Sequence, residues 1–506
     1  MPAAVTQPQG QRRYYRYYVL LILILVYIFN FIDRQILGIL ASSIKTELGL
    51  SDQQLGLMGG MAFALFYTAL GIPIALVADR KSRTWIMTGA LTIWSGFTAL
   101  CGFATGFWQL FLCRLGVGVG EAGGVAPAYS LISDYFPPRE RARALAAYSF
   151  GIPIGMAAGV LFGGVIAHQI GWRWAFIICG LVGLLLAPLF KLTVQEPVRG
   201  GFDAKPPQPI RADHSTQAEP ARTRTWNRFG IHLASAAGAL LGGLIAYLTD
   251  WPWAIIVSGL AGLLLASLLR LVMRKPKSSG FDRNPTVNIT TPGLGDALSL
   301  LFQKPSFWLL ALGASCSSIL GYGLAFWLPS FFERSHGLAL VDRSIFYAGI
   351  LFFGGMVGVW LGGSLGDRFG ANDKGNYARV PAVAFLVSLP FFIGGIMSPS
   401  LPLVFFLFVV PQALSLMWLG PTLSAVQHLV PATMRTTASA IFLFVNNLIG
   451  IGFGTWFLGV LSDYLVPRYG ADSLRYSILY GMGFYLLASA LFFLAARRLN
   501  RDWHRE

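Results

Sequence analysis

Three side chains that could carry chemistry interrupt an apolar run near the N-terminus. The run extends from Tyr17 to Leu40 and contains Asn30, Asp33 and Arg34. Their i, i+3, i+4 spacing places all three on one face of a helix. A charged side chain at bilayer depth costs at least about 2.5 kcal/mol, so such residues are rare and usually functional. An acid beside a base at this position predicts a site that handles a proton or an anion.

A second apolar stretch carries Arg114 and Glu121, seven residues apart and therefore again on one helix face. Counting residues from the predicted outer ends of the two spans places Asp33 and Arg114 level, about 10 Å inside, with Glu121 about 10 Å deeper. We expect the two carboxylates and the two arginines to line one cavity. Low dielectric favours a neutral acid and a nearby arginine favours a charged one, so the carboxylates can load and lose a proton. Structural roles, such as an Asp33–Arg34 ion pair, are the alternative.

Composition places these side chains in a membrane. Of the 506 residues 55% are hydrophobic and 12% are charged, and the mean hydropathy is +0.61. Apolar stretches of about 20 residues recur, enough to cross a hydrocarbon core of about 30 Å. The net charge of +16 comes from bases in short loops, so we expect no nucleic acid partner. The first residues lack the order of a signal peptide, so we expect the first span to stay in the mature protein.

We predict an all-α polytopic membrane protein with fourteen spans. A six-helix bundle occupies residues 17–194, and a second one occupies residues 307–497. An inserted transmembrane hairpin at 229–273 lies between them, flanked by cytoplasmic linkers at 195–228 and 274–304. Clusters of bases alternate with loops that carry none, which is the positive-inside pattern with both termini in the cytoplasm. We expect a multi-pass protein of the plasma (inner) membrane, surrounded by the lipid bilayer.

The two predicted bundles carry matching landmarks. An Asp-Arg pair follows the second span and recurs after the eighth. A Pro-x-x-x-Arg segment follows the fourth span, at 137–141, and recurs after the tenth, at 431–435. Matching halves imply a pseudo-symmetric transporter with its site at the interface between the halves. Ordinary loop charge is the alternative to a role in gating. We predict a cytoplasmic gate, closed in the outward-facing state, that consists of Asp79, Arg80, Arg83, Asp367 and Arg368.

One of these landmarks resembles a family signature. The segment Gly363–Gly370 is similar to Gly-x-Leu-Ala-Asp-Arg-x-Gly, the loop signature of the major facilitator superfamily, with Gly366 in place of the alanine. The copy after the second span departs further, because Ala75 and Ser82 stand at glycine positions. The resemblance covers both six-helix halves and implies the major facilitator fold. It does not cover the inserted hairpin.

A narrower resemblance rests on the charged positions. Asp-Arg in the first span with Arg-x6-Glu-Ala in the fourth resembles spinster-type transporters, as do Gly321–Pro329 and Phe444–Asn447. That resemblance implies lysophospholipids, sphingosine phosphate or related amphiphiles as substrates, with proton coupling. It also implies that Asp33 and Glu121 are the protonation sites and that Arg34 is the anion partner. Organic-anion:proton symporters for sugar acids share the same four charged positions.

We therefore predict a secondary active transporter that carries an amphipathic, anionic, lipid-like substrate by proton-coupled alternating access. The alternative is a proton-coupled symporter of small organic anions such as sugar acids. The C-terminal spans are mainly apolar and aromatic, which favours the amphiphile. We expect no enzyme activity, no metal, no cofactor and a monomer, because no catalytic, metal or nucleotide constellation is present. The predicted substrate-binding residues are Asn30, Arg34, Arg114, Tyr322, Asn446 and Asn447, and Gln412, Ser415 and Trp418 are further candidates for the C-terminal wall.

Glycines repeat every four residues in the fifth span, at 151, 155, 159 and 163. Such a ridge lets a neighbouring helix approach closely. We predict that it lines the interface at which the two halves move against each other.

Overall fold

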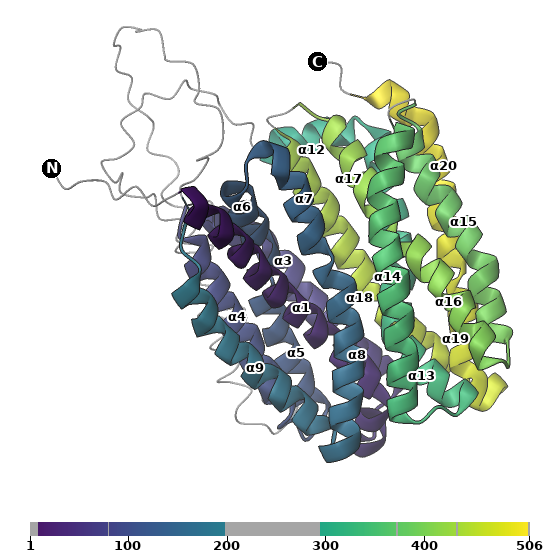
Figure 1. Cartoon of the computed structure of the whole chain (residues 1–506). Coiled ribbons are helices and arrows are strands. Elements are labelled where there is room, and N and C mark those ends of the chain that lie inside the picture. Colours follow the sequence, from purple (N-terminus) through teal and green to yellow (C-terminus); the bar gives the residue numbers. More distant parts are fainter. Residues whose placement is uncertain (1–8, 79, 198–293, 371–372, 432–433, 504–506) are drawn as a thin grey trace, which may run out of the picture.

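The computed structural model describes most of the chain as helices in two bundles that lie side by side (Figure 1). The predicted hairpin, residues 198–228 of the first predicted linker and residues 274–293 of the second lie outside the described residues. Those described are residues 9–78, 80–197, 294–370, 373–431 and 434–503. The described end of the second predicted linker is mostly helical, because α12 spans Leu294–Phe302.

Three of the predicted spans in the first bundle are each broken into two helices: α2 with α3, α5 with α6, and α7 with α8. The break between the fifth and sixth helices follows Glu121 directly, at two consecutive glycines, Gly123 and Gly124. Pro138 occupies the first turn of the seventh helix, where its missing N–H leaves no bond unmade. The helices are α1 (Gln9–Leu48), α2 (Asp52–Gly59), α3 (Met61–Ala78), α4 (Arg83–Cys101), α5 (Phe107–Glu121), α6 (Val125–Tyr135), α7 (Pro138–Ser149), α8 (Gly151–Ile170) and α9 (Trp172–Thr193).

The second bundle begins after the inserted segment. Two of its connections are tight: Gly337 ends α13 in the left-handed conformation that glycine adopts readily, and a 3-10 turn, Gly470–Asp472, links α18 to α19. The helices are α12 (Leu294–Phe302), α13 (Pro305–His336), α14 (Leu340–Gly370), α15 (Asn376–Met397), α16 (Leu401–Leu416), α17 (Leu419–His428), α18 (Arg435–Tyr469), α19 (Ser473–Gly481) and α20 (Gly483–Asp502).

Nine helical stretches in the described part of the chain are long and apolar enough to cross a membrane. The last of them, Thr437–Asp502, includes the turn at Gly470 and therefore contains two of the predicted spans. Helix α5 is not among the nine, because it ends after 15 residues. The chain is thus an all-helical protein with many apolar helices, and the number of fourteen spans stays a prediction.

The two bundles meet along closely packed helices. We call the end at which α1 begins and α20 ends the inner end, and the opposite end the outer end (Figure 1). Helices α2 and α3 pack on α18, and α8 packs on α14. A Cβ atom added at Gly56 or Gly60 would overlap Thr455, so glycine is what allows α2 and α18 to approach this closely. We call Gly56, Gly60 and Thr455 the outer seam.

The glycine ridge of α8 packs within the first bundle. Added Cβ atoms at Gly155, Gly159 and Gly163 would meet residues of α1, namely Ile28, Ile32 and Ile36. The prediction that this ridge lines the interface between the halves was wrong, because the ridge faces α1. Its role in close helix packing is confirmed.

Candidate functional site

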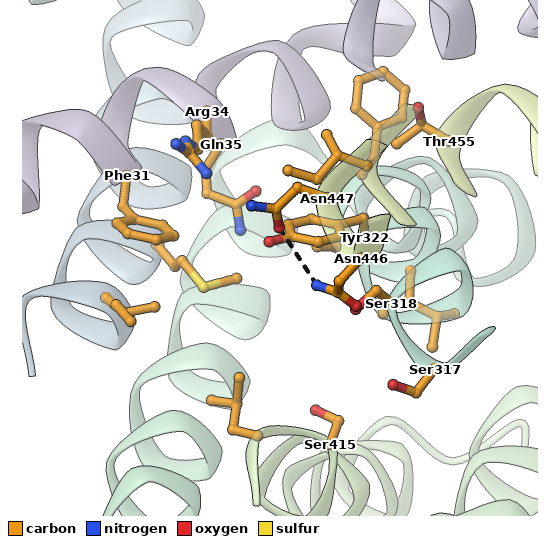
Figure 2. Close-up of a pocket in the computed structure, with 18 of the residues that line it drawn as sticks. Phe31, Arg34, Gln35, Ser317, Ser318, Tyr322, Ser415, Asn446, Asn447 and Thr455 are labelled. Carbon is orange, nitrogen blue, oxygen red and sulfur yellow. Dashed lines mark hydrogen bonds between the residues drawn. The ribbon is translucent and has the colours of Figure 1, made fainter. Parts of the chain in front are cut away.

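A cavity of about 220 Å³ lies between the two bundles. One wall comes from α1, α2, α3, α5 and α8, and the other comes mainly from α13, α16 and α18 (Figure 2). A water molecule occupies about 30 Å³ in the liquid, so the cavity is large enough for a ligand. Five of the predicted substrate-binding residues line it: Arg34, Arg114, Tyr322, Asn446 and Asn447.

Two ion pairs cross between α1 and α5 beside the cavity. Arg34 Nε lies 2.7 Å from Glu121 Oε2, and Arg114 Nη1 lies 3.3 Å from Asp33 Oδ1. The hydroxyl of Thr98 on α4 donates a second hydrogen bond to Asp33, at 2.6 Å. The sequence neighbours Asp33 and Arg34 therefore each pair with a residue of α5. The structure pairs Asp33 with Arg114, the two residues that helix counting places level.

The arginines and the carboxylates of these pairs differ in their access to the cavity. Arg34 and Arg114 line it, whereas Asp33 and Glu121 are 1% and 0% exposed and are not among its lining residues. The carboxylates therefore lie behind the arginines. The prediction that they line the cavity themselves was wrong. Asn30 is also buried outside the lining.

Aromatic rings surround the Arg34 guanidinium. Its Cζ atom lies 4.7 Å from the centre of the Tyr67 ring, 4.8 Å from that of Phe63 and 5.1 Å from that of Phe31. Each face-on contact of a cation with a ring contributes about 0.5–2 kcal/mol, more when desolvated. The aromatic residues thus hold a permanent cation at the edge of an apolar wall, which neither the charge pattern nor the spacing predicted.

The wall from the second bundle is more polar than the sequence led us to expect. Gln412, Ser415 and Trp418 line it, as predicted, and Ser317, Ser318 and Thr455 join them. Most of the hydroxyls are already used: Ser317, Ser415 and Thr455 donate to backbone carbonyls at 2.8–2.9 Å. The side chains left to meet a ligand are chiefly amides.

A second group of charges joins the bundles at the outer end. Asp52, 1% exposed at the start of α2, accepts hydrogen bonds from Lys45 Nζ at 2.6 Å and from Ser462 Oγ at 2.8 Å. Both terminal nitrogens of Arg334 also donate to it, at 2.6 and 2.7 Å. Asp463 of α18 in turn accepts the backbone N–H of Asp52 at 3.2 Å. We call these five residues the outer cluster.

Sequence reasoning missed the outer cluster. A signal was present in the N-cap Ser51 before α2, and in an isolated acid, Asp463, near the end of an otherwise apolar span. The contacts join residues 282 and 410 positions apart, so no local pattern could connect them.

The predicted cytoplasmic gate is described only in part. Arg83 is buried at the start of α4, contacts Asp134, and lies 2.7 Å from Glu196 through its Nε atom. Burial would raise the pKa of the Glu196 carboxyl, but hydrogen bonds from the Thr84 N–H, Arg83 and Ser82 outweigh it and lower that pKa. Asp79 and the side chains of Asp367 and Arg368 lie outside the described residues, so the gate itself stays a prediction.

Two helical bundles with a charged cavity between them form the architecture of a secondary transporter. The chain belongs to the major facilitator superfamily, whose sequence model matches residues 23–227 and 208–455. An MFS-type efflux pump of Mycolicibacterium smegmatis is 28% identical over 482 residues, which cover 95% of this chain and 92% of that protein. Protein spinster homolog 1 of Xenopus tropicalis is 26% identical over 510 residues, which cover 94% of this chain and 81% of the relative.

Solved structures show the same likeness. A bacterial homolog to the human lysosomal transporter Spinster, in an inward-facing and unoccupied conformation, superposes with a TM-score of 0.72 and 28% identity. The superposition covers 97% of this chain and 99% of that one. The resemblance to spinster-type transporters of the major facilitator superfamily is therefore confirmed.

Proposed function

We propose that this protein carries an amphipathic anion across the membrane by proton-coupled alternating access. The observation that carries the proposal is the position of Arg34. Its guanidinium lines the cavity between the bundles and at the same time pairs with Glu121, which is 0% exposed. A substrate anion in the cavity and the Glu121 carboxylate therefore compete for one cation.

This competition couples a proton to the substrate. A buried carboxylate stays charged only while a cation or several donors face it, because an isolated charge in low dielectric is strongly destabilised. When a substrate anion draws Arg34 into the cavity, Glu121 loses its partner and takes up a proton. Release of the anion lets Arg34 return and the proton leave. Asp33, held by Arg114 and Thr98, is the second proton site of the proposal.

The outer end supports an inward-facing state for this structure. Asp52 joins Lys45 of the first bundle to Arg334 and Ser462 of the second, and the outer seam closes beside it. These contacts must separate before the cavity can open to the outside. The bacterial homolog to Spinster is likewise described as inward-facing, both unoccupied and occupied.

The surroundings of Arg34 support an amphiphile as the substrate. Its neighbours Phe31 and Phe63 line the cavity together with apolar residues such as Ile152, Met156 and Leu443. An anionic head at the guanidinium and an apolar tail along these side chains would satisfy both parts of the lining. The amides of Gln412, Asn446 and Asn447 favour the second candidate, a small organic anion such as a sugar acid, because a hydrophilic substrate needs several polar partners.

Proton flux into proteoliposomes tests the proposal. Purified protein is reconstituted with a pH-sensitive dye in the lumen, and lysophospholipids or sugar acids are added in separate series. We expect lysophospholipid to trigger proton movement. Glu121→Gln and Asp33→Asn should each reduce the rate of that movement at least about tenfold, a factor within the range that typical coupling free energies produce. Glu140→Gln, which removes a carboxylate 39% exposed on the surface, is the matched control and should leave the flux unchanged.

Three outcomes contradict parts of this proposal. Flux with sugar acids alone would transfer the assignment to the second candidate. Substrate movement with no change of lumenal pH would remove the proton from the mechanism. Equal losses in Glu140→Gln would show that the two variants act through the fold.

A further inference from the structure

Gln35 is a buried polar side chain that faces the cavity from α1. It is 6% exposed and lines the cavity, and its Nε2 atom donates to no other described residue. In Figure 2 its side chain extends from α1 into the cavity, on the side of Asn447 and Tyr322. A buried amide without a partner is destabilising, so a protein retains one where something else supplies the acceptor.

The opposite wall presents a second amide from α18. Ser318 Oγ donates to Asn446 Oδ1 at 2.9 Å, and Asn446 Nδ2 donates in turn to Asn447 Oδ1 at 3.4 Å. Asn447 Oδ1 is therefore already an acceptor in this chain of hydrogen bonds. Asn447 Nδ2 is the donor at the end of the chain. The half-buried Asn447 lines the cavity, so its NH2 group is available to a ligand there.

The two amides therefore offer the same chemistry. The NH2 groups of Gln35 and Asn447 donate hydrogen bonds and carry no charge. They meet oxygen atoms that need not be ionised, such as hydroxyl groups or an ester carbonyl. Arg34, next to Gln35 in the chain and also in the cavity wall, meets the anionic group.

We propose that Gln35 and Asn447 determine substrate specificity by donating hydrogen bonds to uncharged oxygen atoms beside the anionic group bound by Arg34. This inference rests on the proposed function and narrows its substrate class to oxygen-rich anions. A simple alkyl anion satisfies Arg34 but leaves both amides without acceptors, so it binds more weakly. Because Gln35 belongs to the first bundle and Asn447 to the second, one substrate head contacts both halves.

Matched pairs of ligands separate this specificity from the anion site itself. The first pair is lysophosphatidylglycerol and hexadecyl methyl phosphate, both phosphodiesters with one negative charge, of which only the first has hydroxyl groups and a carboxylic ester. The second pair is gluconate and hexanoate, six-carbon carboxylates with and without hydroxyl groups. Equilibrium dissociation constants are measured by thermophoresis on the purified full chain.

We expect the full chain to bind the oxygen-rich member of a pair at least about tenfold more tightly. Gln35→Met and Asn447→Leu keep the side-chain volume and remove the donors. Each variant should lose most of that preference while its affinity for the plain alkyl member changes by less than about twofold. Retained binding of the plain member also shows that the variant is folded. Gln427→Met, the same loss of an amide at an exposed position outside the cavity lining, is the control and should keep the preference.

The outcomes distinguish this inference from the function on which it rests. If the full chain binds both members of a pair equally, or if Gln35→Met weakens both members in parallel, the specificity role is overturned while amphiphile transport can still stand. If neither phosphodiester binds but gluconate is preferred to hexanoate in a way that depends on Gln35, the amide role is supported and the amphiphile proposal fails.

Discussion

Two groups of buried charges in this protein use their carboxylates in opposite ways. Beside the cavity, Glu121 accepts one hydrogen bond, from Arg34, and its Oε1 atom has no partner among the described residues. At the outer end, Asp52 accepts hydrogen bonds from Lys45, Ser462 and both nitrogens of Arg334. Both carboxylates are at most 1% exposed, so burial alone does not separate them.

The number of partners separates the two carboxylates. A buried carboxylate that accepts hydrogen bonds from several donors stays stabilised when one donor moves away. A buried carboxylate with one partner loses its stabilisation when that partner leaves. We infer that Glu121 is suited to exchange a proton within the transport cycle. Asp52 is suited to stay charged and to hold the bundles together until the whole outer cluster separates.

Loss of the single partner of Glu121 should have the largest effect. Arg34→Met leaves a buried carboxylate unpaired, which we expect to lower the free energy of unfolding by about 3 kcal/mol and to abolish binding of the anion. Thermal unfolding and ligand binding of the purified protein measure the two effects. The double variant Arg34→Met/Glu121→Gln should recover most of the stability but no binding. If Arg34→Met is as stable as the unmodified protein, Glu121 does not depend on Arg34 for its stabilisation.

Asp52→Asn tests the other carboxylate. It removes the charge that Lys45 and Arg334 share, so we expect the population with an open outer end to rise by about tenfold. Spin labels at positions 46 and 464, one in each bundle at the outer end, report the distance by pulsed electron resonance after the native cysteines are replaced. An unchanged distance distribution would mean that the outer seam alone keeps this end closed.

The control for Asp52 is an acid in an exposed ion pair. Asp472 is 47% exposed and pairs with Arg475 one helical turn away, at 3.2 Å. Pairs of this kind contribute about 0–1 kcal/mol. Asp472→Asn should therefore leave both the distance distribution and the thermal stability within error of the unmodified protein.

The Asp472 control aside, the smallest expected effect concerns Glu196 at the inner end. Its pKa in the folded protein lies below the ordinary value of 4.5, because the hydrogen bonds from the Thr84 N–H and Arg83 outweigh burial. Its contribution to stability is then complete above about pH 4.5 and is lost as the pH falls through the folded pKa. We expect Glu196→Gln to cost about 1 kcal/mol near neutral pH and to flatten the acid limb of a plot of unfolding temperature against pH. An acid limb of unchanged slope would show that other groups cause it.

Helix periodicity predicted which charges share a face, and residue counting placed Asp33 level with Arg114. Both follow from the repeat of a single helix, which the sequence contains. The partner of Arg34 could not be predicted in the same way, because the rotation of α1 against α5 depends on packing between helices. The sequence shows Gln35 directly after Arg34, but only the structure places Gln35 in the lining of the cavity.

The glycine ridge of α8 is a second case in which the sequence did not identify the partner helix. The spacing correctly predicted that a helix would approach closely, but several helices were available to do so. The outer cluster depended on tertiary structure altogether, since Asp52 meets Arg334 and Ser462 from distant spans.

The outer seam has a thermodynamic consequence. Where α2 meets α18, Gly56 and Gly60 contribute no side chain, and the contact is made by backbone and by the short side chain of Thr455. Ordering a long side chain at a closing surface costs up to about 2 kcal/mol of entropy, whereas glycine has no rotamers to lose. Closure of the outer end therefore immobilises little at the seam. The protein can repeat that step in every cycle with a small entropy change there. Because the temperature slope of a free-energy difference is the negative of its entropy change, the seam adds little temperature dependence to the free energy of closing the outer end.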